Sequence, residues 1–240
     1  MMTWRHALAF VFLYLVFLIW LFPYQSMVDH TFQRFEDSTG AQITYQTQSA
    51  GPTGVQLRDL HLTMPSGIEV TFNSVRLHPT GVGTMRANFS QGGVQSSLQA
   101  DRHQLHLQLD QVEFQSGTHE LGKVRTTGNL TYDLDRKDGG GDLRLEVPKF
   151  QGPLPIESLE LGTNLNLVDH GQGMEVSAEV HSLGGQEFTG DGNIRVTPQA
   201  GQSGRLSGTL AIRTPSIKKG TLRIEGTWRK PTWSVVNASY

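Results

Sequence analysis

Apolar and polar residues alternate along most of the chain after Gly40, in short runs separated by glycine-rich segments. In Leu105–Leu109, for example, His106 and Gln108 stand between three leucines. Successive side chains of a β-strand point to opposite faces, so each such run predicts a strand with one apolar and one polar face. No helical period recurs after Gly40, and the pattern therefore predicts a mainly β domain of antiparallel strands joined by short turns.

At several places the alternation of apolar and polar residues shifts by one position, and we call such a shift a phase slip. Two adjacent polar residues interrupt it in Val55–Leu62, Val70–Leu77 and Leu107–Phe114, and Ile156–Leu161 carries a shortened copy. A period of two cannot absorb an extra residue without turning apolar side chains outward, unless the strand bulges there. Because bulges bend strands, the slips predict a strongly curved sheet. The alternative is that each polar pair is a tight turn between two shorter strands.

The start of the chain has a different pattern, because Ala7–Phe22 is sixteen residues long without one charge. As a helix, Trp4 to Tyr24 would extend roughly 30 Å, the thickness of a bilayer's hydrocarbon core. We therefore predict a transmembrane anchor in residues 1–24. The alternative is a cleaved signal peptide, although the bulky exit at Trp20 and Phe22 is untypical of one. The residues expected to lie in the anchor or at its interfaces are Trp4, Phe10, Leu13, Phe17, Trp20 and Tyr24.

An amphipathic helix is predicted directly after the anchor. Met27, Val28, Phe32 and Phe35 fall at helical spacing, and Gly40 is a natural stop, so we expect a helix within residues 25–40. It either caps the first strands or lies along the membrane surface. A short N-terminal head is easier to leave in the cytoplasm than a folded domain. We therefore expect a single pass with the C-terminal domain on the other side.

Composition divides the β region into two predicted units. Three prolines and Gly152 interrupt the strands, which predicts a first unit at 41–147 and a second at 156–240. From Arg205 to Tyr240 the formal charge is +6, whereas the whole chain carries −2. This basic end could contact an acidic partner or lipid headgroups, or could be a solvated strand face. Its candidate contact residues are Arg213, Lys218, Lys219, Arg223, Arg229 and Lys230.

Histidines and acidic residues, which could serve in catalysis or bind a metal, are present, but their spacing along the chain does not suit either kind of site. On a strand, His103 and His106 would point to opposite faces and could not share a metal ion. The acidic run Asp133–Asp138 misses the spacing of a calcium loop and is expected at a hairpin tip. We therefore predict no enzymatic activity, no catalytic or metal-binding residues and no cofactor. A domain outside the cytoplasm would not meet nucleic acid, so no nucleic-acid partner is expected.

The order of these features resembles that of a known family. An anchor that ends in Phe22-Pro23-Tyr24 comes first, followed by a short helix. A Gly-apolar-x-Leu-x-x-Leu-x-Leu strand at Gly54–Leu62 follows, and then a second such strand that ends at Pro79. Later strands have a Gly-x-apolar pattern, as in Gly128–Leu130 and Gly208–Leu210. They resemble the N component of bacterial type II secretion systems (GspN) in its short, single-anchor form. More remotely, the strands are similar to those of AsmA and TamB-like proteins.

This resemblance implies a single-pass protein of the bacterial inner membrane with its C-terminal domain in the periplasm. The protein would be a non-catalytic assembly or scaffold subunit of a type II secretion system, with other secretion-system proteins as partners. The remoter likeness implies a curved AsmA-like sheet and an alternative function, a lipid-binding or lipid-transfer module with an apolar groove. A periplasmic hydrolase would need a polar cluster that the sequence does not contain.

Overall fold

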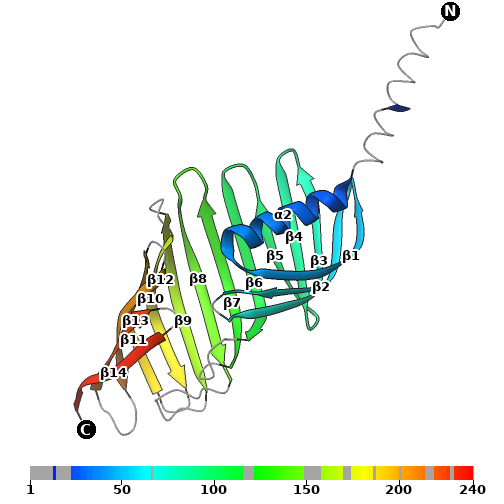
Figure 1. Cartoon of the computed structure of the whole chain (residues 1–240). Helices are drawn as coiled ribbons and strands as arrows, with labels where there is room; N and C mark the ends of the chain where they lie inside the picture. The colour runs from blue at the N-terminus through cyan, green and yellow to red at the C-terminus, as the bar shows by residue number, and fades with distance from the viewer. Residues whose placement is uncertain are drawn as a thin grey trace, which may run out of the picture.

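The computed structural model describes residues 13–14, 23–65, 67–115, 122–148, 158–169, 174–185, 188–199, 202–213, 219–227 and 230–239. Within these ranges one 14-stranded antiparallel sheet follows a short helix, and each strand pairs with the next one along the chain (Figure 1). The prediction of a mainly β, antiparallel domain is confirmed. The elements are α2 (Tyr24–Thr39), β1 (Gln42–Gly51), β2 (Gly54–Thr63), β3 (Glu69–Gly81), β4 (Thr84–Gln91), β5 (Val94–Ala100), β6 (Gln104–Gln115), β7 (Lys123–Asp133), β8 (Asp138–Val147), β9 (Leu159–Asp169), β10 (Met174–Gly185), β11 (Phe188–Gln199), β12 (Gln202–Arg213), β13 (Lys219–Thr227) and β14 (Lys230–Ser239).

The predicted amphipathic helix is present as α2, and it ends at the predicted residue. Gly40 adopts a left-handed conformation (φ 69°) and donates its backbone N–H to the carbonyl oxygen of Glu36, 2.7 Å away. A residue with a side chain is strained at this φ, which explains the stop at a glycine.

Helix α2 packs on the apolar face of the first strands, as the capping interpretation predicted. Val28 and Phe32 contact a buried cluster that includes Leu57 and Val75. The outward residues Met27 and Phe35 remain 54% and 40% exposed. The helix therefore covers the start of the sheet with one face and leaves some apolar surface on the other.

Two of the phase slips are kinks inside strands. Asp59 in β2 and Gln111 in β6 have positive φ values of 50° and 47°, which non-glycine residues rarely adopt. The slip in β3 lies opposite the slip in β2, so the two strands keep one register from Arg58–Ser74 to Leu60–Phe72. In β6 the slip is a register shift against β7. The interpretation of these three slips as turns is therefore wrong, whereas Ile156 of the shortened copy lies outside the described residues.

The β4–β5 hairpin is shorter than its neighbours, and Gln91 fills the gap beyond its tip. The Gln91 side-chain amide donates to the carbonyl oxygens of Thr71 in β3 (2.9 Å) and Glu113 in β6 (2.7 Å), and its oxygen accepts the Glu113 N–H (2.6 Å). Just beyond this bridge, β3 and β6 pair directly through Val70 and Phe114. The Gln91 side-chain amide thus bonds to β3 and β6 as a backbone peptide group would. Elsewhere the β4–β5 hairpin lies between these two strands.

The apolar side chains of successive strands share one face, since residues paired in register point to the same side of the sheet. Ile212 and Ile224 are 0% and 1% exposed in a cluster formed by strands β9 to β13. Glycines are required where neighbouring strands approach closely, since a Cβ at Gly128 or Gly192 would lie 2.1 Å from a carbonyl oxygen of the neighbouring strand.

The sheet is continuous across the predicted seam between the two units. Strands β8 and β9 pair along their whole length, from Val147–Leu159 to Asp138–Val168. The prolines at 153 and 155 lie outside the described residues. The division into units at 41–147 and 156–240 stays a prediction, although one buried cluster does lie in each of them.

The predicted transmembrane anchor lies almost entirely outside the described residues. Of its marker residues, the structure describes Leu13, which is 65% exposed, and Tyr24, the first residue of α2. In the described ranges, no helix has both the length and the hydropathy of a membrane span.

Candidate binding surfaces

A set of leucines in the middle of the apolar face is left partly exposed. Nine leucines on strands β5 to β9 have intermediate exposure and belong to neither buried cluster. They are neighbours across the sheet, since Leu107 of β6 pairs with Leu98 on one side and Leu130 on the other. We call this set the open leucine surface: Leu98, Leu105, Leu107, Leu109, Leu130, Leu143, Leu145, Leu165 and Leu167.

Other parts of the chain close the same face at both ends. On the β1 side, Phe32 of α2 lies against Tyr45, with ring centroids 4.9 Å apart. On the other side, residues of β9 to β13 pack against one another in the cluster around Ile212. Among the described residues, the open leucine surface therefore lies between two covered regions of one apolar face.

Two buried hydroxyl groups on this face have no hydrogen-bond partner among the described residues. Thr126 of β7 and Thr163 of β9 are 4% and 3% exposed, and the Oγ1 atoms of both are unsatisfied. Thr126 lies between Val112 and Leu145 in register, and Thr163 pairs with Val180 on one side. A buried hydroxyl without a partner costs about 1–3 kcal/mol. Both hydroxyls lie beneath the apolar surface, so a polar atom of a ligand reaches them only where neighbouring side chains move aside.

The opposite face of the same strands is polar and carries ion pairs. Arg125 of β7 contacts Glu113 of β6 at 2.8 Å, and Arg144 of β8 contacts Glu160 of β9 at 2.7 Å. The hydrogen bond that Arg125 donates to Glu113 raises the pKa of Arg125. Charge pairing therefore satisfies part of this face, whereas the leucines of the other face are partly exposed among the described residues.

A polar groove of about 780 Å³ crosses strands β9 to β13, and the sequence analysis did not predict it. Asn164, Asn193 and Thr209 line it, together with Arg223 and Glu225, which form an ion pair at 2.6 Å. Three successive residues of each of five strands line it, and the outer two of each three are polar, so the sequence shows them only as the polar half of ordinary β alternation. No signal in the sequence sets them apart from other solvated strand positions.

The structure spreads the predicted basic contact residues along two hairpins. Arg213 ends β12 and Lys219 begins β13, so these two exposed residues lie at the same end of the sheet. Arg223 lies in the polar groove, and Lys230 begins β14 at the opposite end of β13 from Lys219. Lys218 and Arg229 lie outside the described residues.

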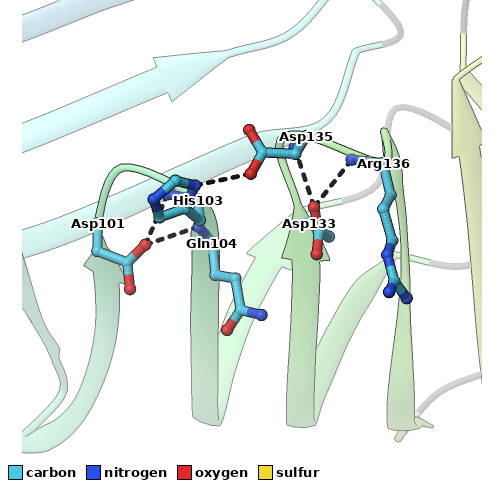
Figure 2. A network of polar contacts seen from close by, with 6 residues as sticks. All are labelled: Asp101, His103, Gln104, Asp133, Asp135 and Arg136. Atoms are coloured by element: carbon cyan, nitrogen blue, oxygen red, sulfur yellow. Dashed lines mark hydrogen bonds and ion pairs between the residues drawn. The ribbon is translucent and has the colours of Figure 1, made fainter.

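A polar network joins the β5–β6 loop to the β7–β8 turn, which confirms that the acidic run is a hairpin tip (Figure 2). His103 Nδ1 donates to Asp135 Oδ2 at 2.7 Å, and this hydrogen bond raises the pKa of His103. Asp101 accepts the backbone N–H groups of His103 (2.8 Å) and Gln104 (2.7 Å), which lowers its pKa. Asp133 accepts two N–H groups of its own turn, and its pKa is also lowered.

This network has a structural role. The side chains of His103 and Asp135 are 70% and 67% exposed, and the other two carboxylates serve the backbone of their turns. His106 contacts Gln104 and Thr131 instead, so the two histidines do not converge. In the part of the chain that the structure describes, no three His, Asp or Glu side chains are grouped to hold a metal ion. The absence of catalysis, metal and cofactor stays a prediction.

Comparison of the chain with protein-family models, with curated proteins and with solved structures finds no match.

Proposed function

We propose that this protein is a non-catalytic, membrane-tethered lipid-binding module whose curved apolar face holds acyl chains. The observation that carries this proposal is the open leucine surface, partly exposed between two closed ends of one face. Contiguous exposed apolar area of this kind is rare on soluble monomers and marks a binding surface.

The dimensions of the surface suit an acyl chain. The surface extends about 20 Å across its five strands and about 13 Å along β6, from Leu105 to Leu109. An extended acyl chain would lie across the strands, along the longer dimension. The unsatisfied hydroxyls of Thr126 and Thr163 lie just beneath this surface, where the polar group of a fatty acid or a phospholipid would bond to them once neighbouring side chains move aside.

The location proposed with this function comes from the sequence. The apolar segment Ala7–Phe22 would hold the protein in the bacterial inner membrane, with the β domain in the periplasm. The sheet would then lie beside a bilayer, from which lipid can reach the face without crossing much water.

A second candidate function is a scaffold subunit of a type II secretion system, which the resemblance to GspN implies. The observation that favours it is that β14 pairs with β13 alone among the described strands, since another protein can add to the edge of a sheet. Co-purification of the full chain from membranes tests it. Recovery of secretion-system components supports the scaffold role, and their absence from a pull-down that retains intact protein argues against it.

A binding assay tests the lipid-binding proposal. The full chain in mild detergent is titrated with a fluorescent fatty acid, and Leu107→Gln is compared with Gln108→Ala on the opposite, exposed face. We expect saturable binding that Leu107→Gln weakens about tenfold through the lost apolar contact and that Gln108→Ala leaves unchanged. Absence of saturable binding, or equal effects of the two substitutions, would contradict the proposal.

A further inference from the structure

Three turns between successive strands lie at the same end of the sheet. They are residues 82–83 between β3 and β4, 101–103 between β5 and β6, and 134–137 between β7 and β8. Each strand is antiparallel to the next, so alternate turns fall at one end, and Figure 1 shows these three along one side of the sheet. We call this set of three turns the turn rim.

Exposed apolar side chains gather at the turn rim. Within the described residues of β1 to β13 and their turns, four large apolar side chains are exposed, and each lies in the rim or within two residues of that end of its strand: Val82 (95%), Met85 (46%), Leu134 (39%) and Met174 (43%). At the opposite end, the β4–β5 turn consists of Gly92 and Gly93, and Met64 beside the β2–β3 turn is half-buried. Single exposed apolar residues are usual on a protein surface, whereas their concentration at one end marks a contact.

The turn that carries Val82 does not itself require an apolar residue. Gly81 pairs with Thr84 across this turn, and Gly83 supplies the positive φ (79°) that suits a two-residue connection. Turn positions are usually taken by glycine, proline, asparagine, aspartate or serine. Val82 contributes almost no buried area to the fold, so its apolar side chain is available for contact with an apolar partner.

Helix α2 leads back to the same end of the sheet. It runs antiparallel to β1, since Glu36 bonds to Ile43 and Asp29 bonds to Tyr45 further along the strand. The first residue of α2, Tyr24, therefore lies toward the β1–β2 turn, which is at the rim end because the start of β2 pairs with the end of β3 (Figure 1). The apolar segment Ala7–Phe22 directly precedes this helix in the sequence. A membrane span there brings the turn rim close to the bilayer.

The charges of the turn rim nearly balance. The Asp101 and Asp133 carboxylates accept backbone N–H groups of their own turns, and Asp135 bonds to a histidine of the neighbouring loop (Figure 2). Across residues 101–103 and 133–138 the formal charge is −1. Attraction to anionic lipid therefore does not favour this end of the sheet, whereas burial of its apolar side chains does. Three exposed basic side chains form no ion pair among the described residues and have the length to reach lipid headgroups: Arg102, Arg136 and Lys137.

We propose that the turn rim is a bilayer-contacting surface, and that Val82 and Leu134 insert into the interface of the membrane that holds the anchor. The strands then stand end-on to the bilayer, and lipid reaches the open leucine surface along the strands. This inference rests on the membrane location proposed above, and it is independent of whether the leucines bind lipid.

A depth measurement tests the contact, and the chain is suited to it because it has no cysteine. Full-length Val82→Cys and Gln95→Cys are each labelled with a bimane fluorophore and placed in phosphatidylcholine nanodiscs that contain lipid with a nitroxide near the headgroup. Gln95 is the matched control, since it is exposed on β5 about 17 Å from the rim end of that strand. We expect about half of the fluorescence at position 82 to be quenched, since interfacial residues lie within about 10 Å of that depth, and that at position 95 to be unaffected.

A second measurement tests whether Val82 itself holds the rim on the membrane. The label is placed at Leu134→Cys, on a different turn, and Val82→Asp or Gln95→Asp is added. Val82→Asp should reduce the quenching at position 134, because a carboxylate resists leaving water, and Gln95→Asp should leave it unchanged. Phosphatidylglycerol added to the nanodiscs should alter neither result.

Three results would overturn the proposal. Equal quenching at positions 82 and 95 in protein that has entered the nanodiscs would refute the rim contact and leave the membrane location standing. Quenching that requires phosphatidylglycerol would assign the contact to charge and not to the apolar side chains. A chain that does not enter nanodiscs would refute the membrane location and the rim contact together, while binding of the fluorescent fatty acid would still report on the leucine surface.

Discussion

The covered and the open parts of the apolar face differ in what lies over them and not in their local sequence. Leu57 and Leu107 both occupy apolar positions of alternating runs, yet Leu57 is 0% exposed and Leu107 remains partly exposed. The difference is the second layer, because α2 contacts the cluster around Leu57. Alternation therefore tells which face of a strand is apolar, and a separate element decides whether that face is core or binding surface.

The largest expected effect comes from truncating one leucine in each part. Leu57→Ala should destabilise the protein by about 3 kcal/mol, since it removes fully buried methyl groups and leaves a cavity. Leu107→Ala should cost about 1 kcal/mol, because its side chain is already partly in contact with water. Denaturant unfolding of the full chain without added lipid measures both. Equal losses would mean that the middle of the face is covered as well as its end.

The contact between α2 and β1 should give the next largest effect. Burial and the hydrogen bond to Asp29 raise the pKa of Tyr45 to about 12. The neutral phenol therefore contributes stability that is fully present below the ordinary pKa of 10.0 and is lost as the pH rises through about 12. Tyr45→Phe should destabilise the protein by about 1 kcal/mol, with Gln46→Ala as the exposed control. Spectrophotometric titration should show a tyrosine that ionises at about 12 in the wild type and not in the variant, whereas Tyr132, whose pKa burial also raises, stays in both.

Replacing the buried Thr163 tests whether its hydroxyl contributes to ligand affinity or to folding stability. Thr163→Val keeps the shape and removes an unsatisfied hydroxyl, so it should leave folding stability unchanged or raise it by up to about 1 kcal/mol. The affinity for fatty acid should fall at the same time, while Thr209→Val in the polar groove should alter neither quantity. A loss of stability in Thr163→Val without any change in affinity would show that the hydroxyl is bonded within the protein.

The smallest expected effect is at the loop network outside the apolar face. The Asp135 carboxylate raises the pKa of His103 above its ordinary 6.5. The stability from this contact is therefore fully present below 6.5 and is lost as the pH rises through the folded-state pKa. Asp135→Asn should lower the pKa of His103 in an NMR titration, because the carboxylate that raises it is removed. An unaltered His103 would mean that the two loops are not joined in solution.

Local patterns predicted the strands and where they bend. The alternation places the apolar residues of all three slipped runs on one face, and the slips at Asp59 and Gln111 coincide with the kinks. Glu36 and Gly40 end α2 within the predicted limits, because a helix stop depends on its own few residues. The unpaired threonines had a visible signal too, as polar residues at apolar positions of alternating runs.

Contacts between distant residues could not be predicted in this way. Gln91 bonds to Thr71 of β3, twenty residues before it, and to Glu113 of β6, twenty-two residues after it. His103 bonds to Asp135, thirty-two residues after it. The extent of the open leucine surface depends on how far α2 reaches and how tightly β9 to β13 curl. Both depend on packing of the whole sheet, which no single run of residues encodes.

The most direct test of a lipid-holding face is native mass spectrometry of the full chain, purified from its own membranes in mild detergent. The account predicts additional masses that correspond to acyl lipids, retained by Gln108→Ala and depleted in Leu107→Gln. A wild-type protein that carries no lipid mass under conditions that preserve its fold would contradict it.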